Sequence, residues 1–309
     1  MLDLSPEITA LEQRGLINAA ASAKLCADET RAQFSLWPEL RFLTWTGVIA
    51  IVTGVGLVLK EHAETIGDLA LATVILLVAL ACYYVGWRKR AAVPHSLLFD
   101  YLPLLGALLV SADVAFLESR YHIFDEHWRW HLMLLAVLHG SVAYWLHHKQ
   151  VFSLAILSIA GWAGVDEEGA FWGEAFENAV SLFQAGGVTL LIAIAHRWRL
   201  ERWREFRATA EGFAAHFLVL GALILSFDDT WRWAGVALTL ALGAVMFWWG
   251  WRERREGLAI FSVIYMAIAV EVAIIDLVNE AALAFLFILV INPILLVGLY
   301  IIHRRWSER

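Results

Sequence analysis

The sequence predicts an all-α, polytopic transmembrane helix bundle of about ten spans, and three observations lead to this fold class. Hydrophobic residues make up 61% of the 309-residue chain and charged residues 17%, whereas soluble domains contain about 45–50% and about 25%. The hydrophobic residues are gathered in long runs, and about 20 such residues cross the hydrocarbon layer as a helix. The basic residues are concentrated in alternate loops, as the positive-inside rule requires.

The first forty residues differ from the rest of the chain. They are polar and helix-prone, and they predict a small cytosolic helical hairpin, residues 1–40, ahead of a transmembrane domain, residues 41–309. Ser5 and Asn18 can cap two helices, and Gly15 can end the first one. The segment lacks the basic start and apolar core of a signal peptide. We expect either a leader that docks on the membrane domain or a partner-binding module.

Ten apolar segments follow this hairpin. They are placed near residues 42–59, 69–87, 97–117, 130–146, 151–164, 178–195, 212–227, 233–251, 257–278 and 281–302. The fifth is short, and a re-entrant segment there would break the count. Of the 23 Lys and Arg residues, all but Lys60, Arg120, Arg129 and Arg232 precede the first segment, follow the last one or fall in every second loop. Ten spans with both termini in the cytoplasm fit this distribution.

The most basic loop is "HRWRLERWREFR", residues 196–207. It is amphipathic enough to lie along anionic lipid headgroups. In the simpler interpretation it is a topology signal whose long side chains reach the interface.

On the opposite face, "YHIFDEHWRWH" (121–131) is rich in residues that can bind metals. His127 and His131 stand four apart, as do His122 and Glu126, so on a helix each pair would share a face and suit zinc. The stretch lacks an HExxH motif, and interfacial loops commonly contain such residues. We therefore predict the outer membrane boundary there and no metal site.

Acidic residues inside the spans give the strongest functional signal. Asp113 lies in the third segment, and Glu271 and Asp276 lie in the ninth. A carboxylate in the bilayer costs several kcal/mol unless it is neutral, paired or facing water. We expect all three to point into the bundle, with a central ninth span and Glu271 toward the third. Asp276, nearer the outer surface, could instead reach water. Candidate polar neighbours are His139, Gln184, His216 and Asn292. Two interpretations stay open: an interhelical hydrogen-bond network, or a cavity that carries a proton or an ion.

Small residues predict close helix contacts. Gly235, Thr239 and Gly243 recur every fourth residue on one face of the eighth segment, which lets a neighbouring helix approach.

Four stretches resemble a known family. They read "LEQRGLINAAASAKL", "TGVIAIVTGVGLVL", "LLGALLVSADVAFLESRYHIFDEHW" and "LLAVLHGSVAYWLHHKQVFSLAILSIAGWAG". This pattern resembles the bacterial predicted membrane proteins grouped as domain of unknown function 2157 (DUF2157), over roughly the first half of the chain. The stretch after the first span, "KEHAETIGD", departs from the family's small-residue, Asn-Trp type sequence. The resemblance implies a multi-pass protein of the bacterial inner membrane and assigns no catalytic residue.

Three classes of function follow from these features. A structural or accessory subunit comes first, a transporter or channel for a small solute or ion that uses buried carboxylates comes second, and a membrane-embedded enzyme comes third. The sequence has no phosphate-binding glycine loop, nucleophile elbow or Cys/His pair, so we expect no cofactor. The expected partners are the lipid bilayer and other membrane subunits or further copies of the chain, and no nucleic acid.

Overall fold

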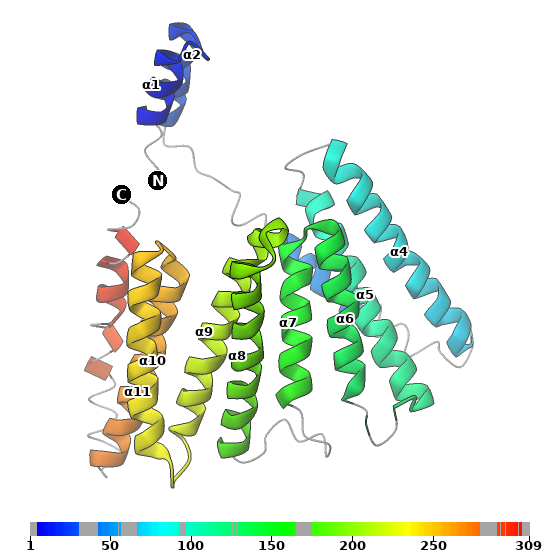
Figure 1. The fold of residues 1–309 in the computed structure, drawn as a ribbon, viewed down its shortest axis with the longest axis vertical. Coiled ribbons are helices and arrows are strands. Elements are labelled where there is room, and N and C mark those ends of the chain that lie inside the picture. Colours follow the sequence, from blue (N-terminus) through cyan, green and yellow to red (C-terminus); the bar gives the residue numbers. More distant parts are fainter. Residues whose placement is uncertain are drawn as a thin grey trace. The chain divides into compact units, whose positions relative to one another are not determined.

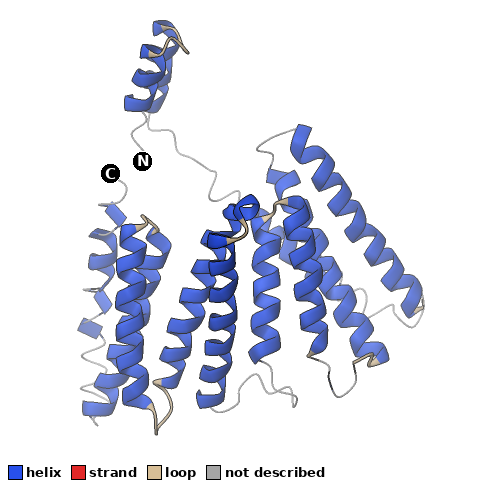
Figure 2. Ribbon diagram, viewed as in Figure 1, coloured by secondary structure: helices blue, strands red, loops and turns tan. Residues whose placement is uncertain are grey.

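The computed structural model describes residues 5–30, 43–54, 56, 67–92, 97–124, 127, 129–164, 175–278, 289–290, 292–293, 295–301 and 303–304. Their regular structure is helical, with no strand in these ranges (Figure 2). The chain divides into two compact units, one of Met1–Phe42 with Glu280–Arg309 and one of Leu43–Asn279. The division into domains 1–40 and 41–309 stays a prediction.

In the first unit, helices α1 (Ser5–Gln13) and α2 (Ala19–Thr30) contact each other. The side-chain oxygen of Asn18 accepts a hydrogen bond from the Ala21 N–H at 2.8 Å, which caps the start of α2. Gly15 lies between the two helices with φ +70°, a conformation that glycine adopts without a steric penalty. Both residues occupy the places that the sequence suggests for a cap and a stop. The cytosolic location of this segment stays a prediction.

The second unit is built from helices alone in its described part. They are Leu43–Gly54, α4 (Asp68–Ala92), α5 (Leu97–Tyr121), α6 (Trp130–Leu146), α7 (Lys149–Gly164), α8 (Ala175–Trp198), the 3₁₀-helix η2 (Glu201–Phe206), α9 (Arg207–Leu225), α10 (Arg232–Arg252) and α11 (Glu256–Val278). The most extensive contacts join α4 to α5, α6 to α7, α8 to α9 and α10 to α11. These antiparallel pairs follow one another in a row, with α4 and α5 at one side and α10 and α11 at the other (Figure 1).

Six of the described helices are long and apolar enough to cross a membrane. The candidate spans are Asp68–Lys89, Tyr101–Tyr121, Ala175–Trp198, Arg202–Leu225, Arg232–Arg252 and Glu256–Val278, and shorter apolar helices cover Leu43–Gly54, Trp130–Leu146 and Lys149–Ala163. This confirms an all-helical protein with several candidate spans. The predicted segment near 281–302 lies largely outside the described residues.

Small residues let these helices approach closely. A Cβ on Gly235 of α10 would lie 2.3 Å from the backbone nitrogen of Ser226, and one on Gly243 would lie 2.5 Å from Met266 Cγ of α11. The Thr239 side chain between them is fully buried. The small-residue stripe of the eighth segment therefore faces protein on α10, where a larger residue would force the chains apart.

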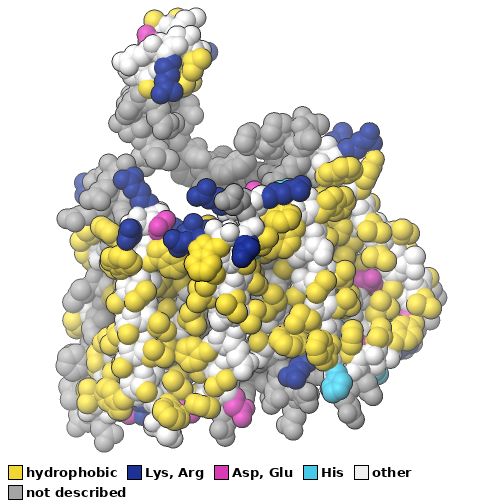
Figure 3. Space-filling model, viewed as in Figure 1, with side chains coloured by type: hydrophobic (Ala, Val, Ile, Leu, Met, Phe, Trp, Pro, Cys, Tyr) yellow, Lys and Arg dark blue, Asp and Glu magenta, His cyan; other side chains and the backbone are white. Residues whose placement is uncertain are grey.

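Basic residues gather at one end of this unit. The described connections between α6 and α7, α8 and α9, and α10 and α11 lie at that end (Figure 1), and Lys and Arg side chains mark its rim in Figure 3. The described basic residues in these connections or in the helix termini at this end include Arg88, Lys149, Arg199, Arg204 and Arg252. The alternation read from the sequence thus corresponds to a basic end of the folded unit.

Candidate functional site

Two of the predicted polar residues come from the neighbouring helices α5 and α6. His139 of α6 is buried, and its Nε2 lies 2.8 Å from Ser111 Oγ of α5. Ser111 donates its proton to the Ala107 carbonyl oxygen at 3.1 Å, which leaves its oxygen to accept from the imidazole N–H. With that tautomer, Nδ1 of His139 is an acceptor, and it has no hydrogen-bond partner in the structure.

Asp113 lies two residues beyond Ser111 on α5. It is 5% exposed, and its Oδ1 atom has no hydrogen-bond partner. Asp113 Oδ1 and His139 Nδ1 are therefore two of the buried polar atoms without a hydrogen-bond partner among the described residues. Such unsatisfied groups are uncommon inside proteins, which makes each of them a candidate polar position within the spans.

The structure does not bring Glu271 next to Asp113. Helix α5 contacts α4, α6 and α7, whereas α11 contacts α10 and α9 and lies at the other side of the row (Figure 1). The expectation of a central ninth span with Glu271 toward the third is therefore wrong in the described part of the chain. The reason is that each hairpin packs on its chain neighbours, so helices several hairpins apart are separated.

The other predicted residues of the polar site lie in separate places. Asp276 forms an ion pair with Arg232 of α10, which also contacts Asp229. His216 of α9 places Nδ1 3.2 Å from the Tyr265 hydroxyl of α11. Gln184 on α8 is exposed. Asn292 is exposed in the other unit.

The residues weighed as metal ligands do not share a helix face in the described region. His122 is exposed and has φ +46° in the turn after α5, and His127 is exposed before α6 begins at Trp130. His131 is half-buried in α6, and Glu126 lies outside the described residues. Within the described ranges no three His, Cys, Asp or Glu residues are grouped as a metal site would require.

A buried ion cluster at the basic end was not found from the sequence. Glu211 of α9 is 7% exposed and lies 2.6 Å from Arg207 Nε and 3.0 Å from a terminal guanidinium nitrogen of Arg255. The spacing of four residues between Arg207 and Glu211 can be seen in the sequence. The contact with Arg255 cannot, because Arg255 is 44 residues from Glu211. The cluster connects the start of α9 to the turn between α10 and α11.

An aromatic cluster at the same end was also missed. The Tyr144 hydroxyl lies 3.1 Å from His196 Nε2, and the two rings stack with centroids 5.7 Å apart. Phe152 and the fully buried Phe206 pack against this pair. The residues of this cluster come from α6, α7, α8 and η2. No pattern within one stretch of the sequence therefore predicts the cluster.

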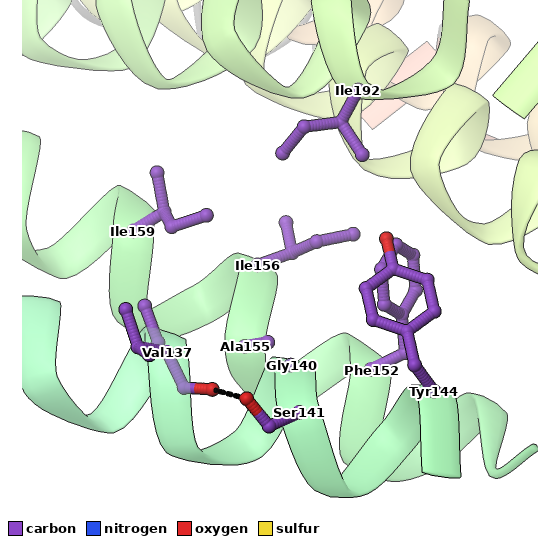
Figure 4. Close-up of a pocket in the computed structure, with 10 residues that line it drawn as sticks. Val137, Gly140, Ser141, Tyr144, Phe152, Ala155, Ile156, Ile159 and Ile192 are labelled. Atoms are coloured by element: carbon purple, nitrogen blue, oxygen red, sulfur yellow. Dashed lines mark hydrogen bonds between the residues drawn. The ribbon is translucent and has the colours of Figure 1, made fainter. Parts of the chain in front are cut away.

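Next to this cluster is an apolar hollow of about 280 Å³ between α6, α7 and α8, and Tyr144 and Phe152 of the cluster also line it. Helix α7 contributes Phe152, Ile156 and Ile159 to its surface, and Ile192 comes from α8. Figure 4 shows these side chains around an open space, with Tyr144 at one end. The hollow offers a surface for an apolar molecule and few polar groups.

The described fold and its apolar helices define the class: a multi-pass helical membrane protein. The model of a family described as predicted membrane protein (DUF2157) matches residues 9–152, which confirms the resemblance found in the sequence. No curated protein and no solved structure matches the chain. The matched region ends at Phe152 in α7, so it includes Asp113 and His139 but not the Glu211 cluster.

Proposed function

We propose that this chain is a multi-pass protein of the bacterial inner membrane with a structural or accessory role in a larger assembly. It crosses the bilayer ten times and keeps both termini and the N-terminal hairpin in the cytoplasm. The six long apolar helices, the three shorter ones and the apolar segment near 281–302 supply the ten spans. The basic end of the second unit supports a cytoplasmic location for that end, because Lys and Arg are retained on this side.

The observation that supports a structural role is the set of polar contacts between different helices. Among the described residues, several polar side chains join one helix to another, while hydroxyls such as those of Thr73, Ser141 and Thr239 bond to the backbone of their own helix. The links are Arg120–Asp68 (α5 to α4), Ser111–His139 (α5 to α6), Tyr144–His196 (α6 to α8), Glu211–Arg255 (α9 to the start of α11), His216–Tyr265 (α9 to α11) and Arg232–Asp276 (α10 to α11). Such contacts fix neighbouring helices in lipid, where apolar surface alone gives no preference for a partner.

A transporter is the second candidate, and one observation favours it. Asp113 Oδ1 and His139 Nδ1 are buried without hydrogen-bond partners, and acidic and imidazole groups in spans commonly serve proton or ion pathways. Transport also needs a water-accessible polar cavity near the bilayer centre. The hollow described beside α6 has a mainly aliphatic and aromatic surface, which supports the structural role instead.

Proteoliposome flux measurements separate the two candidates. Liposomes with the purified full chain and an internal pH-sensitive dye are exposed to proton, sodium and potassium gradients. We expect no flux above protein-free liposomes. A flux that disappears in Asp113→Asn but persists in Glu253→Gln, a matched change at an exposed carboxylate, would overturn the structural role.

The assembly is measured on protein extracted from native membranes. The chain is solubilised in a mild detergent and its mass is determined by native electrophoresis and light scattering. We expect a particle larger than one copy of the chain, made with other membrane subunits or with further copies. A monodisperse monomer under all mild conditions would contradict the accessory role.

A further inference from the structure

The few polar side chains on the surface of the hollow between α6, α7 and α8 already have hydrogen-bond partners. Among the side chains on its surface, only those of Ser141 and Tyr144 carry polar groups. Ser141 donates to the Val137 carbonyl oxygen at 2.7 Å, as the dashed line in Figure 4 shows, and the Tyr144 hydroxyl is bonded to His196. A space of about 280 Å³ without free polar groups does not hold ordered water. Its natural occupant is an apolar chain.

The hollow lies on helices that carry basic residues at one end. Lys149, Phe152, Ile156 and Ile159 follow one another at spacings of three, four and three on α7, so Lys149 lies on the face that forms the hollow. The Lys149 side chain is exposed at the first position of that helix.

Helix α8 repeats this arrangement. Arg199 follows Ile192 by seven residues, which returns it to the same face about two turns nearer the basic end. The Arg199 N–H still bonds to the Ala195 carbonyl oxygen at 2.9 Å, so the helical course reaches this residue. Arg199 is exposed, and the Glu205 carboxylate of η2 is paired with His147 at 2.6 Å. Positive charge is therefore left above the hollow.

We propose that this hollow binds one acyl chain of an anionic glycerophospholipid, whose phosphate lies between Lys149 and Arg199. The hydrocarbon chain covers Ile156, Ile159 and Ile192, and the headgroup lies at the level of Tyr144 and above. Basic pockets at the ends of spans select anionic headgroups by charge, and the apolar hollow fixes where the lipid sits. The site does not depend on which side of the membrane the basic end faces.

Native mass spectrometry of the full chain tests the proposal. The protein is released from nanodiscs made of phosphatidylethanolamine and phosphatidylglycerol at a ratio of four to one, and retained lipids are counted. We expect one phosphatidylglycerol to be retained in preference to phosphatidylethanolamine. Lys149→Ala combined with Arg199→Ala should lower the retained fraction about tenfold, since each basic group near the headgroups contributes a several-fold effect. Arg88→Ala combined with Lys89→Ala, the same charge change at exposed positions of α4, should leave retention unchanged.

A second variant tests the hollow independently of charge. A Cβ on Gly140 would meet no atom closer than 4.0 Å, so Gly140→Leu fills the hollow without a forced clash at the backbone. It should abolish retention of the lipid, while Gly187→Leu on α8, where a Cβ meets nothing within 4 Å, should not. Equal retention of both lipids by the wild type, or wild-type retention by Gly140→Leu, would overturn the proposal. Size-exclusion profiles of all variants show that the fold is kept.

Discussion

Removing the Glu211 carboxylate should destabilise the second unit more than any exposed charge substitution. Glu211 is 7% exposed and accepts hydrogen bonds from Arg207 at 2.6 Å and from Arg255 at 3.0 Å. The change Glu211→Leu leaves two guanidinium groups without their carboxylate. Breaking a buried ion pair typically costs about 3–5 kcal/mol.

The expected cost is somewhat lower because the two arginine side chains are not fully buried. Arg207 is 25% exposed and Arg255 is 23% exposed, so water can replace part of what the carboxylate supplied. We expect Glu211→Leu to lower the free energy of unfolding by about 2–4 kcal/mol. Glu211→Gln, which keeps one acceptor of similar length, should cost about half as much.

The assay is equilibrium unfolding by sodium dodecyl sulfate in dodecyl maltoside micelles, followed by tryptophan fluorescence. Trp249, whose ring lies 5.7 Å from the Arg255 guanidinium carbon, is one of the 16 tryptophans that contribute to this signal. Asp229→Leu is the matched control, because the carboxylate of Asp229 is 94% exposed and Arg232 keeps Asp276. The reasoning is refuted if Glu211→Leu unfolds at the wild-type detergent fraction, or if Asp229→Leu is equally destabilising.

Three further outcomes are expected. A single cysteine at Arg202, in a background without the two native cysteines, should resist an impermeant thiol reagent in intact cells and react after lysis; labelling from outside would reject the ten-span topology. Gly235→Ala should lower stability by more than about 2 kcal/mol, since its Cβ would meet backbone at 2.3 Å, whereas Gly187→Ala should be neutral; detergent unfolding of both variants measures the contrast. His139→Phe should cost only about 1 kcal/mol in the same assay, because Ser111 keeps its bond to Ala107, and a loss of several kcal/mol would show that the imidazole contributes much more.

The sequence by itself predicted the described helices and the concentration of basic residues at one end of the second unit. Hydrophobic runs of the required length and alternate basic loops depend only on the order of residues in the chain. They can therefore be recognised without knowing which residues are in contact. The same holds for local signals such as the Asn18 cap and the glycine at residue 15. A membrane simplifies this inference, because lipid forces each span to satisfy its own backbone.

Only the tertiary structure decided which residues meet. Glu211 contacts Arg255 across a separation of 44 residues, and Tyr144 contacts His196 across 52. Asp113 and Glu271, which the sequence analysis expected to face each other, lie in separate helix pairs. The physical reason is that lipid is as apolar as the helix surfaces, so hydropathy does not choose between neighbours. The choice depends on the fit of small residues such as Gly235 against a facing backbone and on polar pairs across helices, and both are set by three-dimensional geometry that a linear pattern does not contain.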